Sequence, residues 1–194
     1  MGRGLVILGI LAAVALGLWV YNWERKPSSQ LPEEIGTLNA KALPWSEYIS
    51  PLGQFKVLLP SHPHHSRESH DRKEYEIFLA PRDEATLYSI NLISLPLEDG
   101  NTENFLEKFM GDMLKNNPQN LVKNMHKGKF QNENAYDFTV SSQGTQITGK
   151  AFLIDKTLYV LSVTNKDGEL NPQEFDFFIK SFQLKTPPAA IPAK

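Results

Sequence analysis

The side chains best suited to chemistry are gathered in one segment, from His62 to Asp71. Imidazole and carboxylate groups are suitable ligands for zinc, copper or nickel. In an extended segment alternate residues point to the same side, so histidines two positions apart can face one ion. The candidate metal ligands of this segment are His62, His64, His65 and His70.

A second interpretation of this segment is a solvated linker between two strands that is rich in histidine. Arg67, Arg72 and Lys73 lie close by and would oppose a bound cation. Short histidine-rich tracts are compositional evidence for metal and no more. From the sequence both interpretations stay open.

Elsewhere no motif specifies a reaction. The chain has no Gly-x-Ser-x-Gly, no His-Glu-x-x-His and no phosphate-binding loop. It has no cysteine, which excludes disulfides, thiolate metal sites and cysteine nucleophiles. Its net charge of -2 gives no reason to expect a nucleic-acid partner. We therefore expect a protein that is not an enzyme and carries no cofactor.

Several lysines follow one another from the end of a predicted helix into the next predicted strand. They are Lys115, Lys123, Lys127 and Lys129. Such a set would suit anionic lipid or an acidic partner. Single surface lysines are also ordinary, so the sequence alone does not assign a function to them.

The N-terminal segment from Leu5 to Tyr21 is apolar and carries no charge. Together with Gly4 it would span roughly 27 Å as a helix, near the thickness of a hydrocarbon core. The alternative is a cleaved signal peptide, but the one Ala-x-Ala, at residues 13–15, lies inside the apolar run. We expect an uncleaved single-pass anchor, with the following domain on the extracytoplasmic side of the membrane.

The rest of the chain divides by composition into three parts. Residues 22–44 are polar and punctuated by proline, as in a flexible tether. Residues 45–184 have the length of one domain. Residues 185–194 form a Pro/Ala-rich tail that we expect to be disordered.

Within the domain, apolar residues alternate with a period of two in most segments and change to a helical period in two of them. We expect strands at residues 46–50, 54–59, 75–80, 87–95, 122–130, 135–141, 147–154 and 158–164. We expect helices near 105–114 and 172–182. Strands that are apolar on both sides must be covered on both sides. The predicted fold class is therefore α+β, a mainly antiparallel sheet covered by helices on both faces.

The last helix carries the strongest local signal. Asn171 is a favourable N-cap, Pro172 suits the first helical position, and Glu174 stands where a capping box places an acid. The side chains that would share one face are Phe175, Phe178, Ile179 and Phe182. We expect this face to pack on the sheet.

The opening and closing segments of the domain resemble a known family. Residues 48–60 contain Gly-x-Phe-x-Val-x-x-Pro, which looks like the entry hairpin of PsbP/Mog1-like domains. The run Leu158–Val163, a capped helix and then Phe178–Phe182 resemble the way those domains end. The resemblance covers residues 45–184. It implies an α/β/α sandwich and an accessory or binding role, and it carries no functional residues over to this chain.

From these observations we expect a non-catalytic, membrane-tethered accessory or protein-interaction domain. Its partner would be a protein in the same membrane, since tethering raises the effective concentration there. The alternative is a metal-binding domain that uses the segment from His62 to His70.

Overall fold

The computed structural model describes residues 45–70, 73–95, 102–115, 120–142, 144–166 and 170–185, with a few side chains in these ranges left aside. The predicted membrane span and tether lie outside these residues, as does the predicted tail beyond Lys185. No helix of the described ranges is long and apolar enough to cross a membrane.

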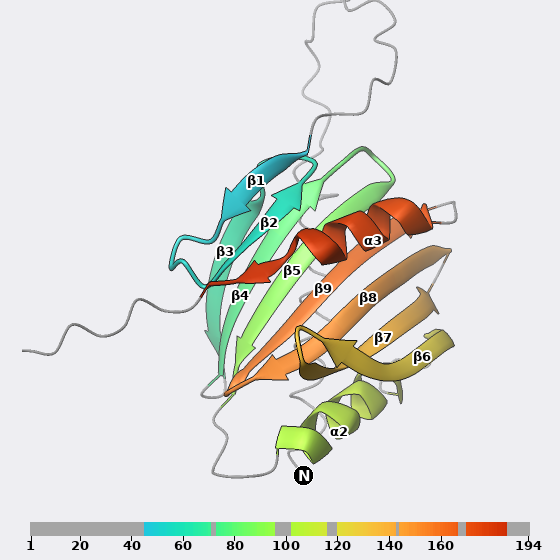
Figure 1. The fold of residues 1–194 in the computed structure, drawn as a ribbon. Helices are drawn as coiled ribbons and strands as arrows, with labels where there is room; N and C mark the ends of the chain where they lie inside the picture. The colour runs from blue at the N-terminus through green and yellow to red at the C-terminus, as the bar shows by residue number, and fades with distance from the viewer. Residues whose placement is uncertain are drawn as a thin grey trace, which may run out of the picture.

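The fold is built on one large antiparallel sheet (Figure 1). In spatial order its strands are β3 (His64–His70), β4 (Lys73–Pro81), β5 (Thr86–Ser94), β9 (Thr157–Lys166), β8 (Thr145–Ile154), β7 (Glu133–Ser142) and β6 (Leu121–Phe130). Each neighbouring pair is antiparallel. β3 and β6 are therefore the two end strands of this sheet.

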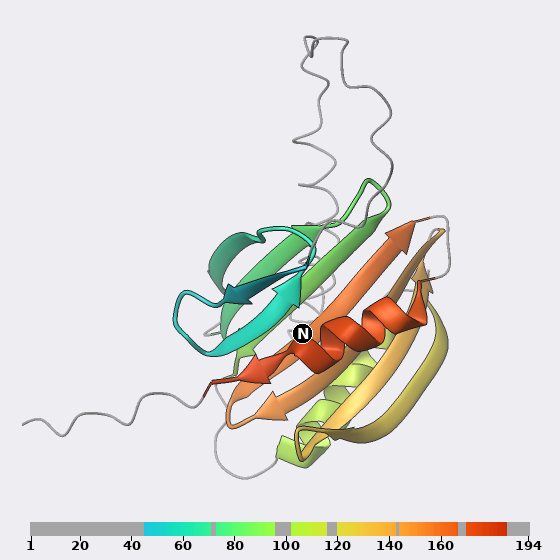
Figure 2. The ribbon, with the colours of Figure 1, turned by 45° about the horizontal axis from the view of Figure 1, so that its top comes forward.

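A second, three-stranded sheet lies across the first (Figure 2). Its strands are β1 (Ser46–Ile49), β2 (Phe55–Leu59) and β10 (Gln183–Leu184), with β2 in the middle. The predicted hairpin is confirmed: β1 and β2 pair around a turn in which Gly53 has a φ of 68°. Glycine takes this left-handed conformation without steric cost.

The two helices are α2 (Thr102–Lys115) and α3 (Pro172–Ser181). The start of α3 is as predicted, because the Asn171 side chain accepts a hydrogen bond from the backbone N–H of Gln173 at 3.0 Å. Glu174 is placed differently from a capping-box acid: its carboxylate contacts the guanidinium of Arg82 and accepts from the hydroxyl of Tyr88 at 3.5 Å. The helix start is thus tied to the end of β4 and to β5.

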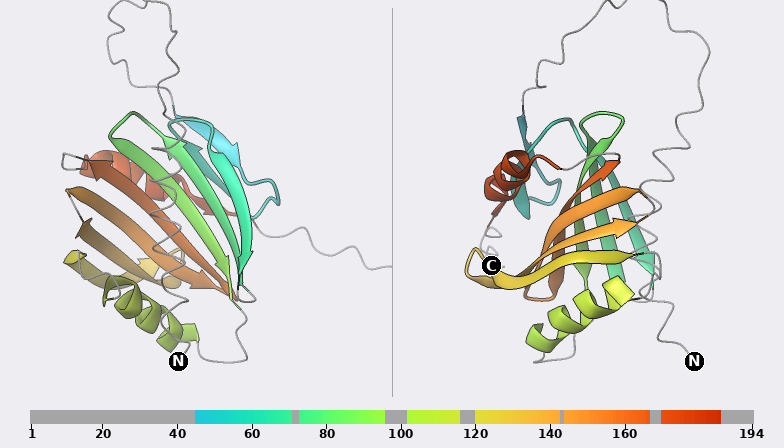
Figure 3. Two further views of the ribbon diagram at one scale, coloured as in Figure 1. Left: turned by 180° about the vertical axis from the view of Figure 1, so that it is seen from behind. Right: turned by 90° about the vertical axis from the view of Figure 1, so that its right-hand side faces the viewer.

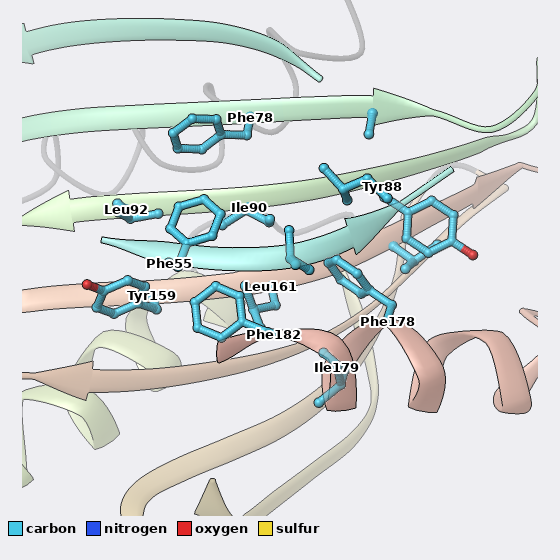
Figure 4. Packing of buried hydrophobic residues seen from close by; sticks show 14 of the residues in the cluster. Phe55, Phe78, Tyr88, Ile90, Leu92, Tyr159, Leu161, Phe178, Ile179 and Phe182 are labelled. Atoms are coloured by element: carbon cyan, nitrogen blue, oxygen red, sulfur yellow. The ribbon is translucent and has the colours of Figure 1, made fainter. Parts of the chain in front are cut away.

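One face of the large sheet is covered by α3 together with the small sheet. Phe55, from β2, packs with Phe178 and Phe182 over the middle strands (Figure 4). All three side chains are no more than 1% exposed. Burying a large aromatic contributes roughly 1.5–3 kcal/mol, so this cluster stabilises the whole domain. The predicted docking of the last helix is confirmed.

The opposite face carries α2 (Figure 3). Leu106, Phe109 and Met110 are buried in a second cluster, with Phe138 among their partners. On the large sheet α2 contacts chiefly β7 and β8. Gly149, on β8, makes close packing possible here, because an added Cβ would lie 2.4 Å from the ring of Phe138.

The predicted fold class is confirmed in its main part: the domain is mainly antiparallel sheet with two short helices. Cover by helices on both faces is not what the described residues show. On one face the small sheet takes much of the place expected for a helix, and on the other α2 lies over one part of the sheet. The hairpin strands were predicted, but their docking as a separate layer has no signal in local sequence.

Candidate functional site

The histidine segment is an edge strand and not a linker. β3 pairs with β4 throughout, from His64 beside Leu79 to His70 beside Lys73. The linker interpretation was therefore wrong for residues 64–70. Its sequence lacks the apolar alternation that marks a half-buried strand, because an end strand needs little cover and charges protect its open side.

Strand geometry separates the histidines. His65 stacks on Phe78, with ring centroids 4.4 Å apart, whereas His64 lies at the next position and so on the opposite face. His70 follows His64 by six residues, and at about 3.3 Å per residue their backbones lie roughly 20 Å apart along the strand. His62 precedes the strand and meets the ring of Tyr48 edge-on at 5.6 Å.

The four predicted ligands are therefore not gathered around one point. Within the described part of the chain, no group of three His, Cys, Asp or Glu side chains is placed to hold a metal ion. The side chain of His70 lies outside the description. Metal binding by this segment stays a prediction, and the geometry limits it to a subset of the four histidines.

A buried carboxylate lies next to β3, and sequence reasoning missed it. Glu76, on β4, is 6% exposed and stands opposite Arg67 in the strand register. Its Oε2 is 3.7 Å from Nε2 of His65, and its Oε1 is 3.8 Å from Nε of Arg67. Oε2 has no hydrogen-bond donor within the described residues.

The charge of Glu76 reaches two tyrosines. Burial raises the pKa of Tyr48, and the nearby carboxylate of Glu76 raises it further. Burial also raises the pKa of Tyr159, with smaller contributions from Asp155 and Glu76. The sequence signal was a second glutamate, two positions after Glu74, among the apolar residues of β4, and pairing with β3 explains it.

The other end strand, β6, is exposed along most of its length. Leu121, Val122 and Met125 are 65%, 40% and 43% exposed. Of the six large apolar side chains exposed among the described residues, these are three. Val122 pairs with the buried Val140, and Met125 pairs with the buried Phe138, so an apolar strip continues from the α2 cluster to the open edge.

The charges of β6 have one sign. Lys123, Lys127 and Lys129 lie on this strand, and no acidic residue does. A bulge between Val122 and Asn124 interrupts the pairing with β7, and the Lys123 ammonium donates to Oε1 of Gln146 at 3.2 Å. The predicted lysine set is thus partly brought together, since three of its members share one edge; the side chain of Lys115 is not described.

These two edges differ in what they can bind. Around Glu76, the side chains of His65 and Arg67 approach a buried acid at 3.7 and 3.8 Å, and this arrangement serves mainly to hold β3. At β6, exposed apolar groups and positive charge border an end strand. The backbone N–H and C=O groups on the outer side of such a strand are available for pairing with another chain. The candidate functional site is therefore the β6 edge, formed by residues 121–130.

Comparisons with known proteins bear on the fold alone. No protein-family model and no curated protein matches this sequence. Among solved structures, the chain is similar to cyanobacterial PsbP (CyanoP) from Synechocystis sp. PCC 6803, at 10% identity and a TM-score of 0.52, over 78% of this chain and 99% of that one.

Two further structures are less similar. A Pseudomonas aeruginosa protein of unknown function has 10% identity and a TM-score of 0.38, over 58% of this chain and 87% of that one. A Bacteroides thetaiotaomicron protein has 17% identity and a TM-score of 0.39, over 72% of this chain and 48% of that one. With the strand order and the two helices described above, the likeness to the cyanobacterial protein shows that the domain has a PsbP-like fold.

Proposed function

We propose that this protein is a non-catalytic, membrane-tethered accessory domain that holds a protein partner through the β6 edge. The observation that carries the proposal is the exposure of Leu121, Val122 and Met125 on an end strand. Contiguous exposed apolar groups bordered by polar ones are typical of protein-interaction surfaces. An end strand adds unpaired backbone groups that a second chain can satisfy.

Tethering is the second part of the proposal. It rests on the charge-free run from Leu5 to Tyr21 and on the polar segment that follows it. A flexible tether would hold the domain near proteins of the same membrane and raise their effective concentration. A weak edge interaction would then suffice. We place the domain on the extracytoplasmic side.

Site-specific photo-crosslinking in intact membranes tests the interaction. A photoreactive amino acid at Met125 is expected to give one discrete crosslinked protein species. The matched control is Phe177, which is also exposed, at 44%, but lies on α3. Crosslinks of equal yield from both positions, or none from Met125, would contradict an interaction surface at β6.

The topology is tested separately. The intact mass of the membrane-bound chain should include residues 1–21, and the domain should resist protease added from the cytoplasmic side. A mature chain that begins after the apolar run would mean a cleaved signal peptide. That result would contradict the membrane tether and leave the proposed interaction surface at β6 unaffected.

A further inference from the structure

We infer that β6 takes up an acidic, extended segment of the partner, which adds to the sheet as a further strand. This inference rests on the proposed function and specifies the partner's chemistry. From Asn124 to Phe130 the pairing of β6 with β7 runs without interruption, so the outer side of this stretch is regular. The bulge lies at its N-terminal end and leaves that stretch intact.

The register of β6 determines which side chains a new strand would meet. Met125 pairs with Phe138 and Lys127 pairs with Tyr136, both on the face that α2 covers. Lys129 has the same parity and shares that face. Asn124, His126 and Gly128 alternate with them and lie on the face of α3.

A fitting segment therefore has a period of two. On the α2 side it places one apolar residue beside Met125 and acidic residues beside Lys127 and Lys129. Opposite charges on adjacent strands stabilise pairing, and an apolar neighbour would extend the cover of the buried Phe138. The intervening positions face Asn124, His126 and Gly128 and can be β-branched polar residues.

A second copy of this chain fits poorly. Antiparallel pairing of residues 124–130 of two copies about their middle would place Lys127 of one copy directly opposite Lys127 of the other. Like charges directly opposite each other destabilise a strand pair. Lysines on an end strand thus oppose self-pairing and still permit an acidic strand.

A lipid surface also fits poorly, because exposed groups of β6 lie on both faces of the strand. A flat anionic bilayer would contact the exposed groups of one face and leave those of the other face without a binding partner.

The test uses the full chain in a nonionic detergent and a fluorescent acidic peptide. The peptide has about nine residues, long enough at ~3.3 Å per residue to follow residues 124–130. It carries glutamate and valine at alternate positions with threonine between them. Anisotropy should show saturable binding that the double substitution Lys127→Glu and Lys129→Glu weakens at least about tenfold.

Three matched reagents isolate the mechanism. A peptide with lysine in place of each glutamate should bind the double variant more tightly than it binds the original chain. A peptide with N-methylated alternate amides keeps its charges but cannot pair as a strand, so its binding should be lost. Glu68→Lys, an exposed substitution on β3 at the other end of the sheet, should leave the affinity within about twofold.

Certain outcomes overturn the inference. Equal binding of the N-methylated peptide would show attraction by charge without strand addition. Binding to anionic vesicles that depends on Lys127 and Lys129, without peptide binding, would assign the edge to lipid. A concentration-dependent dimer that the double variant abolishes would assign it to a second copy. A discrete crosslink at Met125 together with any of these results would preserve the proposed function and remove only the acidic strand.

Discussion

The two end strands of the large sheet, β3 and β6, each have one unpaired side but differ in how their charges are arranged. At the β3 end, Arg67 and His65 approach Glu76, and Arg67 also pairs with Glu74 at 2.7 Å, so opposite charges neutralise each other within the edge. On the strand β6 itself the charges are all positive and apolar side chains are exposed among them; the nearest acids, Glu133 and Asp137, lie on the neighbouring β7. An edge whose charges pair with one another offers less attraction to a charged partner, whereas a strand whose charges have one sign favours a partner of the other sign.

Both edges depend on a common core, so we expect a change in that core to have the largest effect on the free energy of unfolding. Phe178→Ala removes a side chain that is 0% exposed and leaves a cavity. The free energy of unfolding should therefore decrease by about 3–5 kcal/mol. The adjacent Phe177, 44% exposed, meets only the rim of the cluster through Trp45, and its replacement by alanine should cost about 1 kcal/mol or less. Urea unfolding of the full chain in detergent measures both.

If the two substitutions had similar effects, α3 would not be docked as described. The two edges would then not share the core described above.

Metal titration tests how many of the predicted histidine ligands at the β3 end can bind one ion. Because His64 and His65 face opposite sides and His70 is roughly 20 Å further along the strand, a single ion can use at most two of the predicted ligands. We expect each true ligand to change copper(II) affinity at least about tenfold when replaced by alanine. Calorimetry on the four single variants should find no more than two such positions.

Loss of affinity in all four variants would mean that β3 rearranges to bind metal. The β3 edge would then be a binding site as well, and the contrast with β6 would fail.

The β6 end predicts a smaller effect from its apolar part. Met125→Ala removes a half-exposed side chain, so the acidic peptide should bind about fivefold more weakly while the free energy of unfolding changes by less than about 1 kcal/mol. Peptide titration and urea unfolding on the same sample separate the two quantities. An unchanged affinity would leave lysine charge as the sole determinant of binding at this edge.

The smallest expected effect is the contribution of Tyr159, which is influenced by Glu76, to the loss of stability at alkaline pH. Burial raises the pKa of Tyr159 above its ordinary value of 10.0, so the folded state keeps the proton where the unfolded state loses it. This contribution is fully present below about pH 10 and is lost as pH rises from there through the folded pKa.

Unfolding followed between about pH 9 and 11 should therefore show a shallower loss of stability in Tyr159→Phe than in the original chain. A loss that is equally steep in both would mean that Tyr159 does not contribute to it. Tyr159 would then be less buried in the folded protein than its 6% exposure indicates.

Local sequence determined most of the elements, because their signals are short-range. Alternating apolar residues and turn signals marked the β1–β2 hairpin and the strands β4 to β9, and the Asn171–Pro172 start marked α3. Apolar residues on both sides of β5 and β9 already required cover on both faces, since such strands cannot face water. The antiparallel character followed from the short turns at Gly144 and Asp155, which have φ values of 79° and 52°.

Tertiary structure alone decided three features. β3 carries no apolar period, so its strand form depends on pairing with β4. The small sheet exists because β10, at the far end of the domain, meets β2, and no local pattern specifies so distant a contact. The exposure of Leu121, Val122 and Met125 depends on β6 being last in the strand order, because the same apolar residues in a central strand would be core. Residue types thus set which segments are strands, and long-range pairing decided which strand is left open to a partner.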